Sequence, residues 1–447
     1  MIRFGTDGLR GVANADLTTE VAMSLGRAAA RTLPAATYLV GRDTRRSGPM
    51  LQAALSAGLA AEGVDVVDLG VLTTPGVAYC SERRGVPAAM VSASHNPFSD
   101  NGIKLFGPGG TKLAVETEVA IERMMVPGAG TGPAGPTGGG VGRISEDRGA
   151  AASYRAHLAE SLDGRRLDGL RVVLDCANGA ATAVAPATFE EAGAEVTAIA
   201  CAPDGTNINH QCGSTHPEAL AAAVVSHGAD LGLAFDGDAD RLVAVDHTGT
   251  VADGDTLLAL FAVDLARRGE LSGNAVVVTV MTNLGFRLAM ADRGIEVRET
   301  PVGDRHVLAA LEAEGLALGG EQSGHIVFRR RATTGDGILT GLVLADLVVR
   351  ADRPLAELSA GLVERVPQVL ANVAVTDPGR LASAAEVWAT VSAVEAELDG
   401  SGRVLLRPSG TEPLVRVMVE AVSEERARAA ADRLCEAVQG ALGAGPG

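Results

Sequence analysis

The sequence is poor in aromatic residues, in cysteine patterns and in long apolar runs. Aromatic residues make up only 3% of the 447 residues, so the buried cores must be built from Ala, Val and Leu. The five cysteines are scattered without C-x-x-C spacing, which favours reduced thiols over a disulfide framework or a zinc site. No apolar run approaches the roughly 20 residues of a membrane span, and the first residues lack the apolar stretch of a signal peptide. These absences predict a soluble, cytoplasmic protein.

Positive charge is also scarce, because 38 Lys and Arg stand against 55 Asp and Glu, for a net charge of −17. Nucleic acids and anionic membranes attract basic surfaces, so neither is an expected partner. An anionic ligand would therefore need Arg, Lys, a metal ion or backbone N–H groups gathered at its own site.

Hydrophobic residues are abundant, at 47% of the chain, which is enough to bury large cores in three or four domains. Three segments repeat the order apolar strand, polar turn, amphipathic helix, Gly and second strand. They occupy residues 37–70, 171–199 and 275–300. Gly63, Gly193 and Gly294 stand at the end of each expected helix, where Gly permits a left-handed turn. Val-rich strands that alternate with helices predict three similar mixed α/β sandwich domains.

The pattern changes after about residue 365, where two strands around a turn and one helix predict a smaller C-terminal α+β domain, joined through a hinge near Val366–Ala371. The Pro/Gly-rich stretch 127–142 is expected to form a loop near the end of the first domain. The predicted domains are 1–150, 151–250, 251–366 and 367–447.

The segment VSASHNPFSDNGIKLF (91–106) follows a Val-containing strand with a small polar turn. Ser94 on a turn at a strand's carboxyl end is well placed to act as nucleophile or phosphate carrier, although an ordinary capped turn explains it equally well. We expect Ser94 and His95 to point in different directions, unlike a Ser–His hydrolase pair. Lys104 could return to the same site and neutralise a phosphate or transfer a proton.

The segment AFDGDADRLVAVD (234–246) carries three aspartates at alternate positions. In an extended loop the carboxylates of Asp236, Asp238 and Asp240 can converge, and such oxygen ligands suit Mg²⁺. An EF-hand would need Gly and Glu where this chain has Arg241 and His247. The alternative is a solvated acidic turn, but three crowded acids after an apolar strand favour a cation.

Three further motifs are weaker when each stands alone. Glu321 and Ser323, in the Gly-rich turn LGGEQSGHIVF (318–328), could hydrogen-bond vicinal sugar hydroxyls. Arg10, in FGTDGLRG (4–11), is a candidate to neutralise phosphate. The turn in LLRPSGTEPLVRV (405–417) is rich in phosphate donors, namely Arg407, Ser409, Gly410 and Thr411. Solvated or hairpin turns are the alternatives.

Together, SASHNP, DGDADR, GEQSGH and RPSGTEP resemble the four loops of the α-D-phosphohexomutase family, in the family's order and over essentially the whole chain. Within that family the chain is most similar to the bacterial phosphoglucosamine mutases, through FGTDGLRG, NINHQCGSTH, VGDRH, GGEQSGH and RPSGTEPLVRVMVE. The resemblance implies three topologically similar α/β domains and a smaller fourth one around a central cleft. It assigns phosphoserine, metal, sugar and phosphate binding to the four predicted domains in turn.

The resemblance also implies roles for single residues. Ser94 would carry a phosphoryl group and complete an Mg²⁺ site, one ion per chain, with Asp236, Asp238 and Asp240. The transferring phosphate would be lined by Arg10, His95, Lys104 and Arg241. The substrate would be bound by Glu321 and Ser323, at its 3- and 4-hydroxyls, and by His306, His325, Arg407, Ser409, Gly410, Thr411 and Arg416.

The implied reaction interconverts glucosamine 6-phosphate and glucosamine 1-phosphate through a hexose 1,6-bisphosphate, which also acts as activator. It would feed the synthesis of UDP-N-acetylglucosamine and peptidoglycan in a monomeric or homodimeric enzyme. His306 departs from the glucosamine branch, which usually has Tyr in VGDRYV, so a glucose or mannose phosphate mutase or a specialised relative stays open. An Mg²⁺-dependent aspartate phosphatase would not need Ser94, and a sugar-phosphate sensor would need no phosphoryl acceptor.

Overall fold

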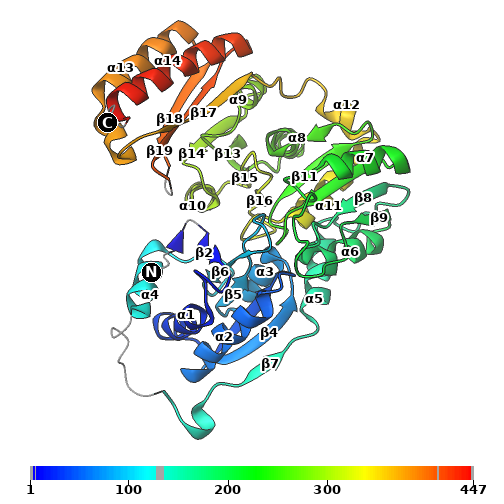
Figure 1. The fold of residues 1–447 in the computed structure, drawn as a ribbon. Coiled ribbons are helices and arrows are strands. Elements are labelled where there is room, and N and C mark those ends of the chain that lie inside the picture. Colours follow the sequence, from blue (N-terminus) through cyan, green and yellow to red (C-terminus); the bar gives the residue numbers. More distant parts are fainter. Residues whose placement is uncertain (1–3, 6, 127–134, 410–411, 444–447) are drawn as a thin grey trace. The chain divides into compact units, whose positions relative to one another are not determined.

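The computed structural model describes residues 4–5, 7–126, 135–409 and 412–443, and its chain divides into two compact units. Unit 1 comprises Met1–Thr279 and Arg298–Ala360, and unit 2 comprises Val280–Val297 and Gly361–Gly447. Figure 1 shows the elements of each unit. Among the described residues, no helix is both long and apolar enough to cross a bilayer.

The first sheet of unit 1 has seven strands in the order β1-β2-β6-β5-β3-β4-β7. The strands are β1 (Phe4–Gly5), β2 (Gly8–Val12), β3 (Thr37–Arg42), β4 (Asp65–Val71), β5 (Ala88–Val91), β6 (Asp100–Phe106) and β7 (Ile144–Glu146). The helices of this region are α1 (Thr19–Thr32), α2 (Gly48–Ala61), α3 (Thr74–Arg84), α4 (Val115–Met125) and α5 (Ala150–Glu160). β3 pairs in parallel with β4 and β5, whereas β6 pairs antiparallel with β2 and β5. The sheet therefore brings β2, β5 and β6, which carry or flank two of the predicted motifs, side by side.

The core of this region is made of small aliphatic side chains, as the scarcity of aromatic residues requires. It includes Leu25 of α1, Leu55 of α2 and Val40 of β3, all fully buried. α1 and α2 approach closely where each has a glycine, because a Cβ on Gly26 would lie 2.3 Å from the Leu55 carbonyl oxygen. The close approach seals one face of the sheet without large side chains.

The second sheet has the order β12-β11-β10-β8-β9, with β8 parallel to both β9 and β10 and β11 antiparallel to β10. Its strands are β8 (Arg171–Asp175), β9 (Glu195–Ile199), β10 (Leu231–Phe235), β11 (Leu242–Asp246) and β12 (Val251–Ala252). Helices α6 (Ala185–Glu191) and α7 (Glu218–His227) belong to this part of the chain. All five residues of β10 and all five of β11 are buried, so the short loop between them starts and ends in fixed positions.

The third sheet has the order β14-β13-β15-β16. Its strands are β13 (Ala275–Thr279), β14 (Glu296–Thr300), β15 (Leu318–Gly320) and β16 (Ile326–Phe328). The nearby helices in the sequence are α8 (Gly254–Arg267), α9 (Leu284–Ala291), α10 (Asp304–Glu314), α11 (Gly337–Ala351) and α12 (Leu355–Ser359). The three predicted repeats are therefore β3-α2-β4, β8-α6-β9 and β13-α9-β14, and the predicted α/β class is confirmed.

Unit 2 contains an antiparallel sheet of order β17-β19-β18, with α13 and α14 along one face (Figure 1). Besides α9, this unit contains β17 (Gln368–Ala374), α13 (Ala385–Leu398), β18 (Arg403–Pro408), β19 (Leu414–Glu420) and α14 (Glu424–Leu442). The predicted smaller α+β domain is thus present, but residues 368–371 of the expected hinge are part of β17. Residues 127–134 of the expected Pro/Gly-rich loop lie outside the described residues.

Candidate active site

Ser94 lies in a buried turn just after β5. Its φ is 53°, a left-handed conformation that is uncommon for a residue other than Gly. The Ser94 N–H donates to Ser92 Oγ at 3.0 Å, and Ser92 Oγ donates to Asp43 Oδ2 at 2.6 Å. The turn is therefore held by a small hydrogen-bonded network, and the Ser94 side chain, of a residue only 1% exposed, has a fixed direction.

Arg45 also holds the Ser94 turn, through its backbone carbonyls. Its guanidinium is fully buried and donates 2.8 Å hydrogen bonds to the carbonyl oxygens of Ser94 and Asn96. It also donates to the carbonyls of Pro97 and Asp100, while Asp43 lies 2.9 Å away and balances its charge. One side chain thus satisfies four backbone acceptors of the loop, which explains why a strained turn can persist there.

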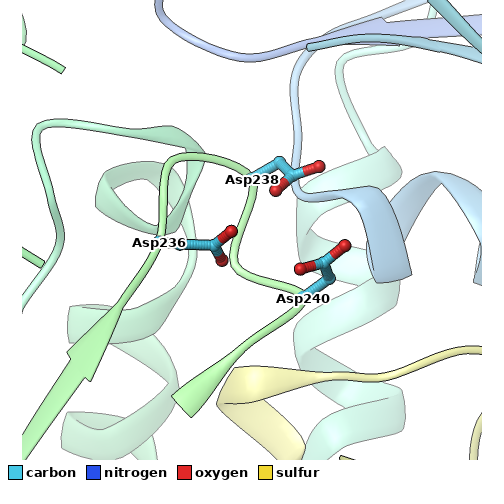
Figure 2. A group of neighbouring side chains, drawn as sticks. All are labelled: Asp236, Asp238 and Asp240. Carbon is cyan, nitrogen blue, oxygen red and sulfur yellow. The ribbon is translucent and has the colours of Figure 1, made fainter. Parts of the chain in front are cut away.

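The three predicted metal ligands converge in the loop between β10 and β11 (Figure 2). Asp236, Asp238 and Asp240 are all buried, and one oxygen of each lies within 4.8 Å of the others. Oδ1 of Asp238 and Oδ1 of Asp240 are buried with no hydrogen-bond partner within the described part of the chain. Three carboxylates with spare buried oxygens suit a hard cation such as Mg²⁺, so these aspartates can hold a metal ion.

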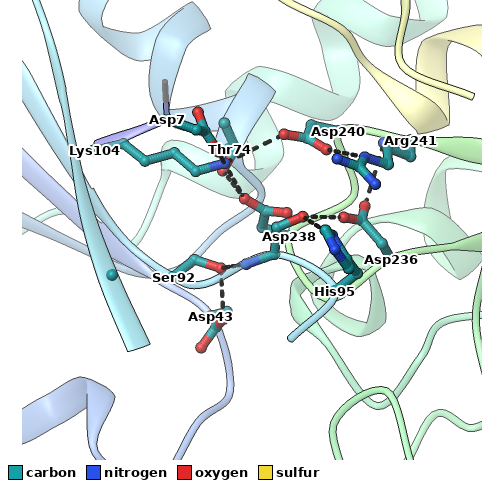
Figure 3. A network of polar contacts seen from close by, with 12 residues as sticks. Asp7, Asp43, Thr74, Ser92, His95, Lys104, Asp236, Asp238, Asp240 and Arg241 are labelled. Carbon is teal, nitrogen blue, oxygen red and sulfur yellow. Dashed lines mark hydrogen bonds and ion pairs between the residues drawn. The ribbon is translucent and has the colours of Figure 1, made fainter. Parts of the chain in front are cut away.

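The structure joins this acidic loop to the Ser94 turn (Figure 3). Ser94 Oγ donates to Asp236 Oδ2 at 2.5 Å, although the two residues are 142 positions apart in the sequence. On the other side, Thr74 Oγ1 donates to Asp238 Oδ2 at 2.5 Å, and the Thr74 N–H at the start of α3 donates to the Asp238 carbonyl. The hydroxyl and the acidic cluster therefore form one site.

Lys104 supplies positive charge beside the cluster. From β6 its Nζ lies 2.8 Å from Asp238 and 3.3 Å from Asp240. It also lies 2.9 Å from Asp7. Burial alone would lower the pKa of Lys104, but the carboxylates of Asp238, Asp7 and Asp240 outweigh it and raise the pKa well above its usual value. Lys104 is therefore a cation near pH 7.

The acids respond in opposite ways to the same surroundings. Burial, followed by the charges of Asp240 and Asp238, raises the pKa of Asp236 well above its usual value. Burial acts in the same direction on Asp240, but Lys104 and then His325 hold the pKa of that carboxyl low. The cluster thus combines a carboxyl that resists ionisation with one that favours it, and a bound cation would favour the ionised form of both.

Arg10 and Arg241 complete the charged surroundings. Arg10, on β2, pairs with Asp7, and the Nε of Arg241 lies 3.8 Å from Asp240 Oδ1. The Nε atoms of both arginines are buried without a hydrogen-bond partner within the described residues, so each has donor capacity left for a ligand. Of the two predicted phosphate neutralisers, Arg241 therefore lies at the acidic cluster. Arg10 lies at Asp7, which also pairs with Lys104.

The prediction for the direction of His95 was wrong. Its Nδ1 lies 3.3 Å from Ser94 Oγ, because the left-handed φ of Ser94 removes the alternation of an extended strand on which the expectation rested. Burial, then Arg241 and Arg10, lower the pKa of His95 to about 4. The ring is neutral near pH 7 and adds no charge beside the hydroxyl.

The predicted sugar-binding residues lie on the loop between β15 and β16 and at the start of α10. Glu321 accepts a 3.1 Å hydrogen bond from the Gly303 N–H, which joins this loop to the VGDRH segment. Ser323 and His306 are exposed. His325 is instead buried, with Nδ1 3.7 Å from Asp240 and Nε2 accepting from the Gly335 N–H at 3.1 Å, so its ring faces the acidic cluster.

In unit 2, Arg407 of β18 and Arg416 of β19 are direct cross-strand partners. Burial and the charge of Arg416 lower the pKa of Arg407. Arg416 Nη2 lies 3.7 Å from Glu412, and its Nε is buried without a partner within the described residues. The Ser409 N–H donates to the Leu414 carbonyl at 2.9 Å. Gly410 and Thr411 lie outside the described residues.

The sequence reasoning missed several residues that hold the site. Asp7 pairs with Lys104 and with Lys112, whose Nζ lies 2.8 Å from it, and Lys112 also pairs with Asp304. Burial would raise the pKa of Asp7, but Lys104, Lys112 and Arg10 lower it well below its usual value. Asp7 stands inside the quoted FGTDGLRG motif. An acidic residue in a motif that is expected to neutralise phosphate could have been predicted to pair with a basic residue of the site. Arg45 carried no comparable signal, because its role depends on backbone carbonyls.

Comparisons with known proteins place the chain among phosphosugar mutases. Sequence models of four phosphoglucomutase/phosphomannomutase domains match in order: the α/β/α domains I, II and III at residues 1–127, 152–249 and 253–366, and the C-terminal domain at 370–437. A phosphoglucosamine mutase of Streptomyces coelicolor is 54% identical over 450 aligned residues, which cover 98% of this chain and 99% of the relative. One from Mycolicibacterium smegmatis is 53% identical and covers 97% and 98%.

Solved structures agree on the fold. A phosphoglucomutase/phosphomannomutase family protein from Burkholderia thailandensis superposes with a TM-score of 0.80 at 27% identity, over 98% of this chain and 97% of that one. An Aspergillus fumigatus N-acetylphosphoglucosamine mutase, solved with GlcNAc-6P and magnesium, has a TM-score of 0.68 at 19% identity, over 99% and 96%. The second likeness concerns the fold alone.

Proposed function

The chain belongs to the phosphoglucomutase/phosphomannomutase family, and we propose that this member interconverts glucosamine 6-phosphate and glucosamine 1-phosphate by relaying a phosphoryl group through Ser94. The observation that carries the relay is the buried Ser94 hydroxyl, 2.5 Å from Asp236 in the acidic cluster. The choice of amino sugar is supported by full-length relatives at 53 to 54% identity, which are phosphoglucosamine mutases.

In the proposed first half-reaction, the 1-hydroxyl of glucosamine 6-phosphate attacks the phosphorus of phosphorylated Ser94. The bond from phosphorus to the sugar oxygen forms, the bond from phosphorus to Ser94 Oγ breaks, and the hydroxyl proton is passed on so that Ser94 regains its O–H. The resulting 1,6-bisphosphate turns end for end. Its 6-phosphate then returns to Ser94, which leaves glucosamine 1-phosphate, so no phosphate is gained or lost over the cycle.

The described side chains provide the charge that this transfer needs. Lys104 is held as a cation beside Asp238 at 2.8 Å, so it is suited to neutralise the phosphoryl group and to donate a proton rather than accept one first. The buried Nε atoms of Arg10 and Arg241 have no hydrogen-bond partner among the described residues, so they suit phosphate oxygens. The His95 ring, neutral because its pKa is lowered to about 4, lies with Nδ1 3.3 Å from the Ser94 hydroxyl and can exchange a hydrogen bond with it.

We further propose that Asp236, Asp238 and Asp240 hold one Mg²⁺ together with an oxygen of the phosphate on Ser94. When bound, the ion would neutralise negative charge on the transferring group. Without it, the chain's own residues still orient Ser94 Oγ toward the cluster and bury it from water, which limits hydrolysis of the phosphoserine.

Substrate contacts are proposed for two groups of residues. Glu321 and Ser323 would bind the 3- and 4-hydroxyls, which lie near the axis of the turnover and so serve both orientations. The remaining proposed contacts are His306, His325, Arg407, Ser409, Gly410, Thr411 and Arg416. His325 faces Asp240 in the structure, so we expect it to act on substrate through that carboxylate.

The relay is tested with Ser94→Ala, which removes the only proposed phosphoryl acceptor. We expect turnover of glucosamine 6-phosphate, with Mg²⁺ and a trace of hexose 1,6-bisphosphate, to fall by roughly three orders of magnitude or more. Intact-protein mass spectrometry should also show loss of the phosphorylated form. Ser99→Ala is the matched control, because Ser99 is exposed on the same loop and should keep full turnover. Full activity in Ser94→Ala would end the relay proposal.

The sugar is tested separately by comparing kcat/KM for the 6-phosphates of glucosamine, glucose and mannose. A preference for glucosamine of about tenfold, roughly 1.4 kcal/mol of transition-state discrimination, would support the amino-sugar assignment. A preference for glucose or mannose would keep the relay and change its substrate, and would direct attention to His306. This result is independent of the Ser94→Ala result, so the two parts of the proposal can fail separately.

A further inference from the structure

Two cysteines that are 25 positions apart come together at the carboxyl ends of neighbouring strands. β8 and β9 are parallel with Asp175 opposite Ile199, and Cys176 and Cys201 follow just after that pair. The Cys176 N–H donates to the Ile199 carbonyl at 3.2 Å, and the Asn178 N–H donates to the Ala200 carbonyl at 2.6 Å. Beyond the last pair, the left-handed φ of 43° at Ala200 breaks the alternation of the strand, and the side chains of Cys176 and Cys201 meet in a hydrogen bond. A disulfide could therefore join them with little rearrangement.

The two thiols differ in the way that a reactive pair requires. Cys176 is fully buried, whereas Cys201 is partly exposed, so a small oxidant in solution meets Cys201 first. A hydrogen bond with the Cys176 side chain lowers the pKa of Cys201 to about 6, and the same contact raises the pKa of Cys176. Cys201 is thus mainly a thiolate near pH 7, the form that attacks peroxides, while Cys176 keeps its proton.

A metal site is a poorer explanation of this pair. The third cysteine nearby, Cys212, accepts a hydrogen bond from Asn178 Nδ2 at 3.8 Å, and burial raises its pKa to about 11. Among the described residues, the aspartates at 236, 238 and 240 form the single group of three or more ligand-type side chains close enough to hold an ion. Two thiols without further ligands suit a disulfide better than a zinc ion.

We propose that Cys201 and Cys176 form a peroxide-sensitive thiol pair, a modification site that is separate from the mutase chemistry. The Cys201 thiolate attacks one oxygen of a hydroperoxide, the O–O bond breaks, and the other oxygen leaves as water or an alcohol after taking up a proton. Cys201 is then a sulfenic acid. The Cys176 thiol attacks its sulfur, the S–S bond forms, and the sulfenic oxygen leaves as water. Two thiols are oxidised and one hydroperoxide is reduced.

The pair is connected by short hydrogen bonds to both the Ser94 turn and the acidic loop of the candidate active site. The residue after Cys176, Ala177, accepts a 2.9 Å hydrogen bond at its carbonyl from the Asn209 N–H. Asn209 Nδ2 in turn donates to the Ser94 carbonyl at 2.9 Å. In the same loop the Ala180 N–H donates to the Gly237 carbonyl at 2.8 Å, within the acidic loop. Any backbone shift on forming the disulfide therefore reaches Ser94 and the acidic loop, and oxidation should lower turnover reversibly.

The test treats the full-length protein with a small excess of hydrogen peroxide and counts thiols in denaturant. We expect the count to fall from five to three per chain, with Cys176 and Cys201 joined in one peptide by non-reducing mass mapping. Dithiothreitol should restore both thiols. Cys176→Ser should stop at a sulfenic acid on Cys201 that a dimedone probe captures, and Cys201→Ser should block both products.

Cys435→Ser is the matched control, because Cys435 is also partly exposed but burial raises its pKa. This variant should still form the linked peptide at the normal rate. A different linked pair, no linkage at all, or equal oxidation of Cys201→Ser would overturn the proposal. Thiol counting does not depend on the mutase assay, so its outcome stands whether or not the amino-sugar assignment holds.

Discussion

At the scale of single residues, the most demanding position is Ser94, whose left-handed φ of 53° needs support from its surroundings. Much of that support comes from one guanidinium, because Arg45 donates to four carbonyl oxygens of the turn and the following loop and is balanced by Asp43. A lysine ammonium in the same cavity has three donors at one point and cannot span acceptors that are spread over several residues. The turn therefore depends on the shape of Arg45 as well as on its charge.

We predict that Arg45→Lys and Arg45→Met both destabilise the protein, by about 3 kcal/mol or more, because each leaves buried carbonyls or Asp43 unpaired. Turnover should fall as well, since Ser94 loses its fixed direction. Chemical denaturation and kcat at saturating substrate measure the two effects. Arg46→Lys is the control. The Arg46 side chain is exposed, so this substitution at the next position should change neither stability nor kcat. Unchanged stability in Arg45→Lys would show that charge alone is enough.

The sequence revealed the charged and hydroxyl residues of the site but not their supports. Ser94, Lys104 and the three aspartates were predictable because their residue types and spacing fit phosphate and metal chemistry. The direction of His95 was mispredicted because the alternation rule applies only to extended backbone, and a positive φ at Ser94 is not visible in the sequence. Arg45 stayed hidden because it binds main-chain oxygens, which leave no pattern of side chains.

At the scale of elements, the hairpin of β18 and β19 places two positive charges directly opposite each other, at Arg407 and Arg416. Like charges in this position destabilise a pair of strands unless an anion lies between them. The carboxylate of Glu412 lies 3.7 Å from Arg416 within the same hairpin. The arrangement favours a phosphate group of the substrate as the missing partner of this hairpin.

We predict that Arg416→Met raises the KM for the sugar phosphate by about tenfold while the hairpin stays as stable as before or becomes more stable. The KM rises because a charge-assisted contact to phosphate is lost, and the hairpin gains because Arg407 loses a like-charged neighbour. Steady-state kinetics and thermal unfolding measure these two quantities. Arg428→Met, on the exposed face of α14, removes the same charge and should leave KM unchanged. A KM that does not respond in Arg416→Met would contradict phosphate binding at this hairpin.

The order of elements was readable because each repeat ends its helix with Gly and has Val-rich strands, so periodicity gave the three α/β segments. Their grouping was not readable. α9, the helix of the third repeat, falls in unit 2 of the structure, while β13 before it falls in unit 1. A local pattern sets which element forms, whereas the division into units depends on long-range packing. For the same reason the expected hinge at 366–371 overlaps β17, whose pairing with β19 begins at Gln368.

At the scale of the whole molecule, which has a net charge of −17, a divalent cation can stabilise the protein in two ways. Any salt screens the mutual repulsion of the surface acids, and this effect falls off over roughly 10 Å at 0.1 M ionic strength. A cation in the cluster of Asp236, Asp238 and Asp240 acts locally, on buried oxygens that are without partners within the described residues. A substitution in the cluster should abolish the local effect and leave the screening effect unchanged.

We predict that Mg²⁺ stabilises the folded chain by about 2.7 kcal/mol at 100 times its dissociation constant, because the ion binds the folded cluster and not the unfolded chain. Thermal unfolding is followed in Mg²⁺ and in NaCl of equal ionic strength, and the shift is compared within each variant. Asp238→Asn should lose the difference between the two salts, even though it also weakens the ion pair with Lys104. Asp432→Asn removes the same charge from the exposed face of α14 and should keep the difference. If Asp238→Asn responds to Mg²⁺ like the unaltered chain, screening of the acidic surface explains the stabilisation and the three aspartates do not form the ion's site.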